Sequence, residues 1–198
     1  MENWLSKEIN YFEKIKDECN VIFDVGASYS PYLNYEKEVH YFDPQPSAID
    51  LLKTQTNRNT KSVFNKFGLS DEDVNLPFYQ PGDFVYTGHT KLGDFDLKIG
   101  RDYLIKHKIE KVDFLKIDVE GYELKVLTGF GDMLNIFKYI QFEYGEVWQT
   151  VGYCLLDVVN YLKLHGFDEF YNIDTDTPLN TFTDNWELCN IICKNKNI

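Results

Sequence analysis

The protein has 198 residues and a formal net charge of −12, from 20 Lys and Arg against 32 Asp and Glu. A field of that sign repels nucleic-acid phosphates and anionic lipid headgroups, which argues against a nucleic-acid partner and against membrane insertion. A hydrophobic content of 43% is sufficient for a globular core and too high for a disordered chain. We therefore expect a single domain over residues 1–198, with an N-terminal helix over 1–20 and a core over 21–198, as a monomer or dimer.

The sequence shows no recognisable secretion signal and no metal-binding cysteine pattern. No apolar run approaches the ~20 residues of a membrane span, and the N-terminus lacks a signal-peptide layout. The cysteines have neither a C-x-x-C pair nor a histidine at zinc-finger spacing; they are Cys19, Cys154, Cys189 and Cys193. We expect reduced thiols and, by default, a cytoplasmic location.

Apolar periodicity and turn residues predict alternating helices and strands. The predicted helices cover residues 3–18, 46–53, 98–108, 121–130 and 151–167. The predicted strands cover residues 21–26, 38–43, 62–70, 112–118, 138–146, 169–174 and 185–194. A polar, turn-rich segment with Pro77 and Pro81 and a loop over 86–95 follow the third strand. This alternation is typical of an α/β fold with a mostly parallel sheet, in which ligands bind at the carboxyl ends of the strands.

Carboxylates end most of the predicted parallel strands. Their positions are Asp24, Asp43, Asp118 with Glu120, and Glu143. A single acid at such a position is commonly the N-cap of the next helix. Acids from several strands that meet at one sheet edge repel one another, and a cationic group between them relieves the repulsion. The pattern therefore indicates a site for a positively charged ligand.

The first strand end, DVGAS, carries one glycine, Gly26, and lacks the G-x-G-x-x-G pattern that binds a pyrophosphate. Asp43 follows Asp24 by ~20 residues, the place from which a carboxylate accepts hydrogen bonds from ribose hydroxyls. A ribose site without a pyrophosphate loop, in acidic surroundings, suits S-adenosylmethionine better than a dinucleotide.

Four segments in order, VIFDVGAS, YFDPQP, FGLSDED and LKIDVEGYELKVLTG, resemble the FkbM family of S-adenosylmethionine-dependent methyltransferases. The resemblance extends from about residue 21 to residue 143. It implies the class I methyltransferase (Rossmann-like) fold, with helices on both faces of a seven-stranded sheet in the order 3-2-1-4-5-7-6 and the last strand antiparallel. It also implies methyl transfer to a hydroxyl group, often on a sugar or a secondary metabolite.

The resemblance further implies a set of cofactor-binding residues. The first strand end would line the methionine end of the cofactor, and Asp43 would bind the ribose. From its own position at a strand end, we also expect Asp118 to lie near the transferred methyl group. The remaining members are Asp24, Gly26, Ala27 and Ser28 at the methionine end, and Gly68, Leu69 and Ser70 beside the adenine. The sequence departs from the family pattern at Ser28, Ser30 and Asp43, where asparagine, glycine and glutamate are common.

A sugar hydroxyl is a poor nucleophile, so a base or a metal ion must assist the loss of its proton. Asp118, Glu120 and Glu143 offer oxygen ligands only, which suits Mg²⁺ or another hard divalent cation. Capping of the next helix by Asp118, with Glu120 in its first turn, is the alternative.

Lys116 and His89 complete the set of candidate catalytic residues. Lys116 points to the same side of its strand as Asp118, and we interpret it as an ion-pair partner of Asp24 and Glu143 or, alternatively, as the base. His89 lies in a loop, where it would serve as general base or substrate contact unless it is an ordinary loop residue.

We expect an O-methyltransferase whose acceptor is a sugar hydroxyl in a glycan, glycolipid or nucleotide sugar. The alternatives are an acceptor hydroxyl on a polyketide or other small metabolite, and a non-catalytic module that only binds the cofactor. A nicotinamide dehydrogenase is a weaker alternative, because the pyrophosphate loop is missing.

Overall fold

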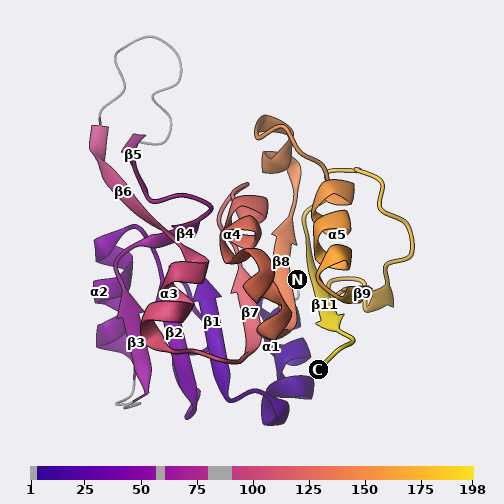
Figure 1. Ribbon diagram of the computed structural model, residues 1–198, viewed down its shortest axis with the longest axis horizontal. Helices are drawn as coiled ribbons and strands as arrows, with labels where there is room; N and C mark the ends of the chain where they lie inside the picture. The colour runs from indigo at the N-terminus through magenta and orange to yellow at the C-terminus, as the bar shows by residue number, and fades with distance from the viewer. Residues whose placement is uncertain (1–3, 57–60, 80–90) are drawn as a thin grey trace.

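The computed structural model describes residues 4–56, 61–79 and 91–198, and its centre is a twisted sheet with helices on both faces (Figure 1). In the described part of the chain this sheet has eight strands, in the order β10-β9-β11-β8-β7-β1-β2-β3. Their bounds are β1 Val21–Val25, β2 Glu38–Phe42, β3 Ser62–Asn65, β7 Val112–Ile117, β8 Phe137–Tyr144, β9 Phe167–Asn172, β10 Thr177–Pro178 and β11 Cys189–Asn195.

The predicted fold class is confirmed. β3, β2, β1, β7 and β8 pair in parallel, and β11 is antiparallel to both of its neighbours, β8 and β9. Without β10, the strands follow the predicted order. The strand number differs from the prediction, because the two-residue β10 adds a strand at the edge of the sheet.

Helices cover the two faces of the sheet unequally. α3 (Gly100–His107), α4 (Glu123–Phe130) and α5 (Leu155–Leu164) lie in front of the sheet in Figure 1, where they bury the larger cluster of apolar side chains. α1 (Trp4–Ile15) and α2 (Pro46–Gln55) pack on the other face. Short 3₁₀ segments complete the helical structure: η1 Lys16–Glu18, η2 Gly131–Ile136 and η3 Glu146–Thr150. Among the described residues, no helix has the length and apolar composition that a membrane span requires.

A second, three-stranded sheet was not predicted. The strand expected over 62–70 divides in two, and its second half, β4 (Gly68–Ser70), pairs in parallel with β6 (Lys91–Ile99). β6 also pairs antiparallel with β5 (Val74–Tyr79). The predicted turn-rich segment is therefore wrong over β5, and the predicted loop is wrong over residues 91–95. Pro77 is tolerated in β5 because β5 is an edge strand.

Candidate active site

The loop that follows β1 packs directly against the loop that follows β7. Gly26 has a positive φ of 81°, and a Cβ atom added there would lie 1.7 Å from the carbonyl oxygen of Asp118. The amides of Gly26 and Ala27 donate to the carbonyl of Phe42 on β2, at 2.9 and 3.1 Å. The amide of Asp118 donates to the carbonyl of Val25 at 3.0 Å. Position 26 requires a glycine because the backbone of Asp118 occupies the space that a Cβ atom would need.

Lys116 lies at the centre of a buried charge cluster. Its Nζ donates to Oδ2 of Asp118 at 3.0 Å and lies 3.9 Å from Oδ1 of Asp24. Asp24 and Lys116 are register partners on adjacent parallel strands, which brings both side chains to the same face. Burial acts to lower the pKa of Lys116, but the carboxylates outweigh it and the pKa lies above that of an ordinary lysine. Lys116 therefore remains protonated and serves as a counter-charge.

Asp24 depends on that counter-charge. Its side chain is completely buried, and in the described part of the chain neither of its oxygens accepts a hydrogen bond. Burial raises the pKa of Asp24, while the charge of Lys116 acts to lower it. The predicted pairing of Lys116 with Asp24 is thus present. No ion pair within 4 Å joins Lys116 to Glu143 in the described residues, although the Lys116 charge acts to lower the pKa of Glu143.

Glu8 on α1 is a member of the cluster that the sequence analysis missed. Its side chain is 2% exposed, and burial, opposed by Lys116, raises its pKa to about 7. The next residue on the helix, the apolar Ile9, is by contrast 38% exposed. The signal was the spacing of Glu8, Phe12 and Ile15, because residues separated by four and three positions share one helical face.

Asp118, Glu120 and Glu143 come together as predicted. One carboxylate oxygen from each of the three lies within 4.8 Å of the others. Burial, followed by the charges of Asp118 and Glu120, raises the pKa of Glu143 to about 8. Glu120 has a positive φ of 53°, an uncommon conformation for a residue with a side chain. Three convergent carboxylate oxygens form a donor set that fits a hard divalent cation.

Glu123 holds the β7–α4 corner in place. Its Oε1 accepts hydrogen bonds from the amides of Val119 and Gly121 at 3.1 and 3.4 Å. The hydroxyl of Tyr153 donates to the carbonyl of Gly121 at 2.5 Å. Burial raises the pKa of Glu123 to about 7. The side chain therefore fixes the loop that precedes α4.

Asp43 lies at the carboxyl end of β2. Its Oδ1 accepts a hydrogen bond from the amide of Gln45 at 2.8 Å, and burial raises its pKa to about 6. Gly68 is close by, since a Cβ atom added there would lie 3.5 Å from the ring of Pro44. The predicted adenine segment, which is β4, therefore adjoins the predicted ribose residue. Ala27 and the β4 residues Leu69 and Ser70 are buried.

Two of the predicted site residues, Ser28 and His89, add no contact to this arrangement of side chains. Ser28 is half-buried, between buried Ala27 and Tyr29, which is 81% exposed. His89 lies outside the described residues.

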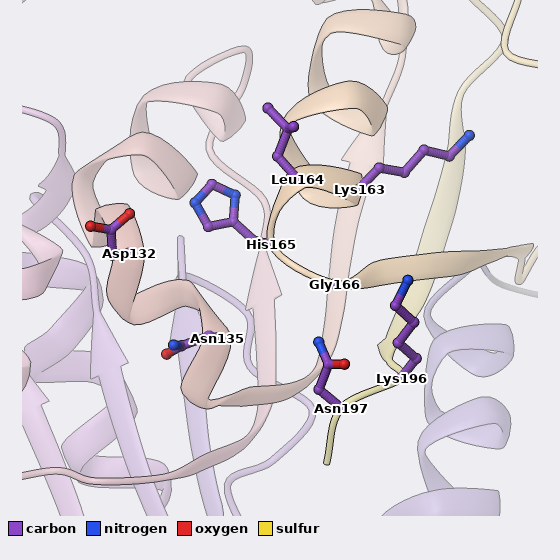
Figure 2. A pocket seen from close by; sticks show the side chains of 8 residues that line it. All are labelled: Asp132, Asn135, Lys163, Leu164, His165, Gly166, Lys196 and Asn197. Atoms are coloured by element: carbon purple, nitrogen blue, oxygen red, sulfur yellow. The ribbon is translucent and has the colours of Figure 1, made fainter.

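Two hollows of the described surface lie elsewhere. A hollow of 530 Å³ is formed by η2, the end of α5 and the C-terminal residues (Figure 2). It is lined by Asp132, Asn135, Lys163, Leu164, His165, Gly166, Lys196 and Asn197. A second hollow, of 420 Å³, lies between α1 and residues 31–37. Neither is lined by the strand-end carboxylates, so the candidate site is identified by its side chains.

Comparison with known proteins gives matches to methyltransferases. The family model of the methyltransferase FkbM domain matches residues 95–169. The curated hexuronic acid methyltransferase AglP of Haloferax volcanii is 28% identical over 133 residues, which cover 63% of this chain. The match covers 55% of AglP, so the chain spans about half the length of this relative.

Solved structures agree on the fold. Methyltransferase FkbM from Methylobacillus flagellatus superposes with a TM-score of 0.53 and 18% identity, covering 88% of this chain and 44% of that one. A TehB-like SAM-dependent methyltransferase from Corynebacterium glutamicum superposes with a TM-score of 0.51 and 10% identity, covering 98% of this chain and 100% of that one. The family match, the curated relative and the fold all agree with the resemblance of this chain to the FkbM methyltransferases.

Proposed function

We propose that the protein is an S-adenosylmethionine-dependent O-methyltransferase whose acceptor is a sugar hydroxyl. The observation that carries the proposal is the convergence of Asp24, Asp118 and Glu143 at one sheet edge, on the fold of a methyltransferase family. The sulfonium and the amino group of the cofactor are both positive, so they suit an edge rich in carboxylates. A sugar acceptor is supported by the name of the relative AglP, a hexuronic acid methyltransferase.

Each part of the edge has a separate task under this proposal. Asp43 accepts hydrogen bonds from the ribose hydroxyls, with β4 beside the adenine. The first strand end, from Asp24 to Ser28, lines the methionine end. Asp118 and Glu143 face the acceptor hydroxyl, where a carboxylate with a raised pKa is a better proton acceptor than an ordinary one.

A divalent cation at Asp118, Glu120 and Glu143 is a second proposal about the same edge. The three oxygens fit such an ion, which would lower the pKa of a bound hydroxyl and offset the repulsion between the acids. An ion there would also matter for the acceptor, because a hexuronic acid is itself anionic. Without an ion, the acidic edge favours a neutral sugar.

The test is transfer of a labelled methyl group from S-adenosylmethionine to a panel of neutral sugars and hexuronic acids, free and nucleotide-linked. We expect transfer to at least one sugar, and a loss of about 100-fold in turnover in the Asp118→Asn variant. Asp168→Asn, at an exposed ion pair with Lys196, is the matched control and should leave turnover unchanged.

The same assay on metal-free protein with a strong chelator tests the cation. Undiminished transfer would exclude a role for the cation.

Other outcomes of this assay identify the alternatives. Transfer to polyketide-like or other small hydroxyl compounds, with none to sugars, would replace the proposed acceptor class. Binding of S-adenosylhomocysteine with no transfer to any acceptor would indicate a module that retains only the cofactor site. Turnover that is equal in Asp118→Asn and the unmodified protein would remove Asp118 from the reaction.

A further inference from the structure

The N-terminal helix brings a buried carboxylate, that of Glu8, near the buried lysine of the site. The rings of Phe12 on α1 and Phe114 on β7 lie 5.2 Å apart. Glu8 precedes Phe12 by four helical residues, a rise of about 6 Å. Lys116 follows Phe114 by two strand residues on the same face, a rise of about 6.6 Å. The contact of Phe12 with Phe114 packs α1 against β7, and the buried side chain of Glu8 lies close enough to Lys116 for the two charges to interact.

The cluster contains more negative than positive charge. Lys116 is 5% exposed and faces three carboxylates, those of Glu8, Asp24 and Asp118. Its Nζ bonds to Asp118 and lies near Asp24, while Oε2 of Glu8 and both oxygens of Asp24 accept no hydrogen bond from any described residue. On the other side of Lys116, its register partner Gln141 contributes a neutral amide, which acts on Glu8 as a hydrogen-bond donor but leaves the net charge unchanged. One ammonium is therefore shared by three acids, which leaves a net charge of about −2 when all three are ionised.

A purely structural role does not explain this arrangement. Burying a third carboxylate around one lysine costs free energy, because desolvation exceeds the gain from a partner that is already neutralised. A glutamine at position 8 would fill the same space without that cost. When all three acids are ionised, a positively charged group at the adjoining sheet edge makes the excess charge favourable.

We propose that Glu8 is a positioning residue of the cofactor site, acting through Lys116 and Asp118. It holds the lysine between Asp24 and Asp118, and its charge makes the edge prefer the cationic S-adenosylmethionine to the uncharged thioether of S-adenosylhomocysteine. This inference rests on the proposed function and adds a residue, contributed by a separate element, that sets the discrimination between substrate and product.

The experiment measures the affinity of both cofactor forms by calorimetry at pH 8 in the unmodified protein and in Glu8→Gln. Neither measurement requires the acceptor to be known. We expect the preference for S-adenosylmethionine over S-adenosylhomocysteine to fall roughly threefold or more in Glu8→Gln. The unfolding temperature should be equal to that of the unmodified protein or higher. Glu13→Gln, the same change at an exposed acid on α1, should alter neither quantity, and Glu8→Asp should retain most of the preference.

Two results would overturn the inference. One is an unchanged preference in Glu8→Gln. The other is an equal weakening of both ligands together with a lower unfolding temperature, because that pattern describes a structural residue only. Failure of the proposed function is a different result, since the unmodified protein would then bind neither ligand.

Discussion

Replacement of Lys116 by methionine is expected to lower the free energy of unfolding at pH 8 by about 3 to 5 kcal/mol. The ammonium is buried and lies between Asp118, at 3.0 Å, and Asp24, at 3.9 Å. In the described part of the chain Asp24 has no hydrogen bond of normal geometry, so the change leaves a fully buried carboxylate with only the nearby Ser30 hydroxyl to offset its burial. Chemical denaturation of the two proteins at the same pH measures the difference.

The difference in the free energy of unfolding between Lys116→Met and the unmodified protein should become smaller as the pH falls from 8 to 5. Even beside Lys116, burial raises the pKa of Glu8 to about 7 and raises that of Asp24 above its ordinary value. Without the ammonium both values rise further, so the folded state binds protons more readily than the unfolded state as the solution is acidified. Stability that is missing at pH 8 is then regained as these carboxyl groups become neutral.

The matched control is Lys66→Met, at an exposed ion pair with Asp50 of 2.7 Å. We expect that change to stay within about 0.5 kcal/mol, because water screens an exposed pair. Equal stability of Lys116→Met and the unmodified protein at pH 8, or a deficit that grows on acidification, would show that Lys116 is not the counter-charge of the site.

Gly26→Ala is expected to lower the free energy of unfolding by more than about 3 kcal/mol and to abolish cofactor binding. The new Cβ atom would lie 1.7 Å from the carbonyl oxygen of Asp118. Backbone hydrogen bonds hold the loop after β1 to β2 and the loop after β7 to β1, so neither loop can easily move away. Relief of the contact requires the β1 and β7 corners to separate, which displaces the acids on both.

A second glycine separates crowding from backbone strain. Gly152 has a φ of 83°, almost the same as the 81° of Gly26, but a Cβ atom added there meets nothing within 4 Å. Gly152→Ala should therefore cost only about 1 kcal/mol, the strain of the left-handed conformation. Thermal unfolding and S-adenosylhomocysteine binding of both variants provide the comparison. Similar behaviour of the two variants would contradict the close approach of the corners.

The parallel core was predictable because its signals are local. Short apolar runs that end in an acid, such as the segments before Asp24 and Asp118, indicate buried strands and place their ends. The resemblance to a known family then supplied the strand order, which depends on long-range pairing that no local pattern contains. The resemblance to the FkbM family and the fold class are confirmed, while the roles of the site residues stay predictions.

The errors have physical causes. β5 and β6 were missed because Pro77 and the neighbouring turn residues suggest a loop, whereas the edge of a sheet accepts a proline. Glu8 was missed because glutamate on an amphipathic helix is usually exposed to water. The expected ion pair of Lys116 with Glu143 was wrong because of the strand register. Lys116 is opposite Gln141, and Glu143 lies two residues farther along β8.

The central claim is that the carboxyl edge of the parallel strands binds S-adenosylmethionine. Calorimetric titration of S-adenosylhomocysteine into the unmodified protein and the Asp43→Asn variant tests it most directly. The account predicts one site per chain and an affinity about tenfold weaker in the variant, because a carboxylate oxygen that accepts from the ribose is replaced by an amide. Absence of binding, or the same affinity in both proteins, would contradict it.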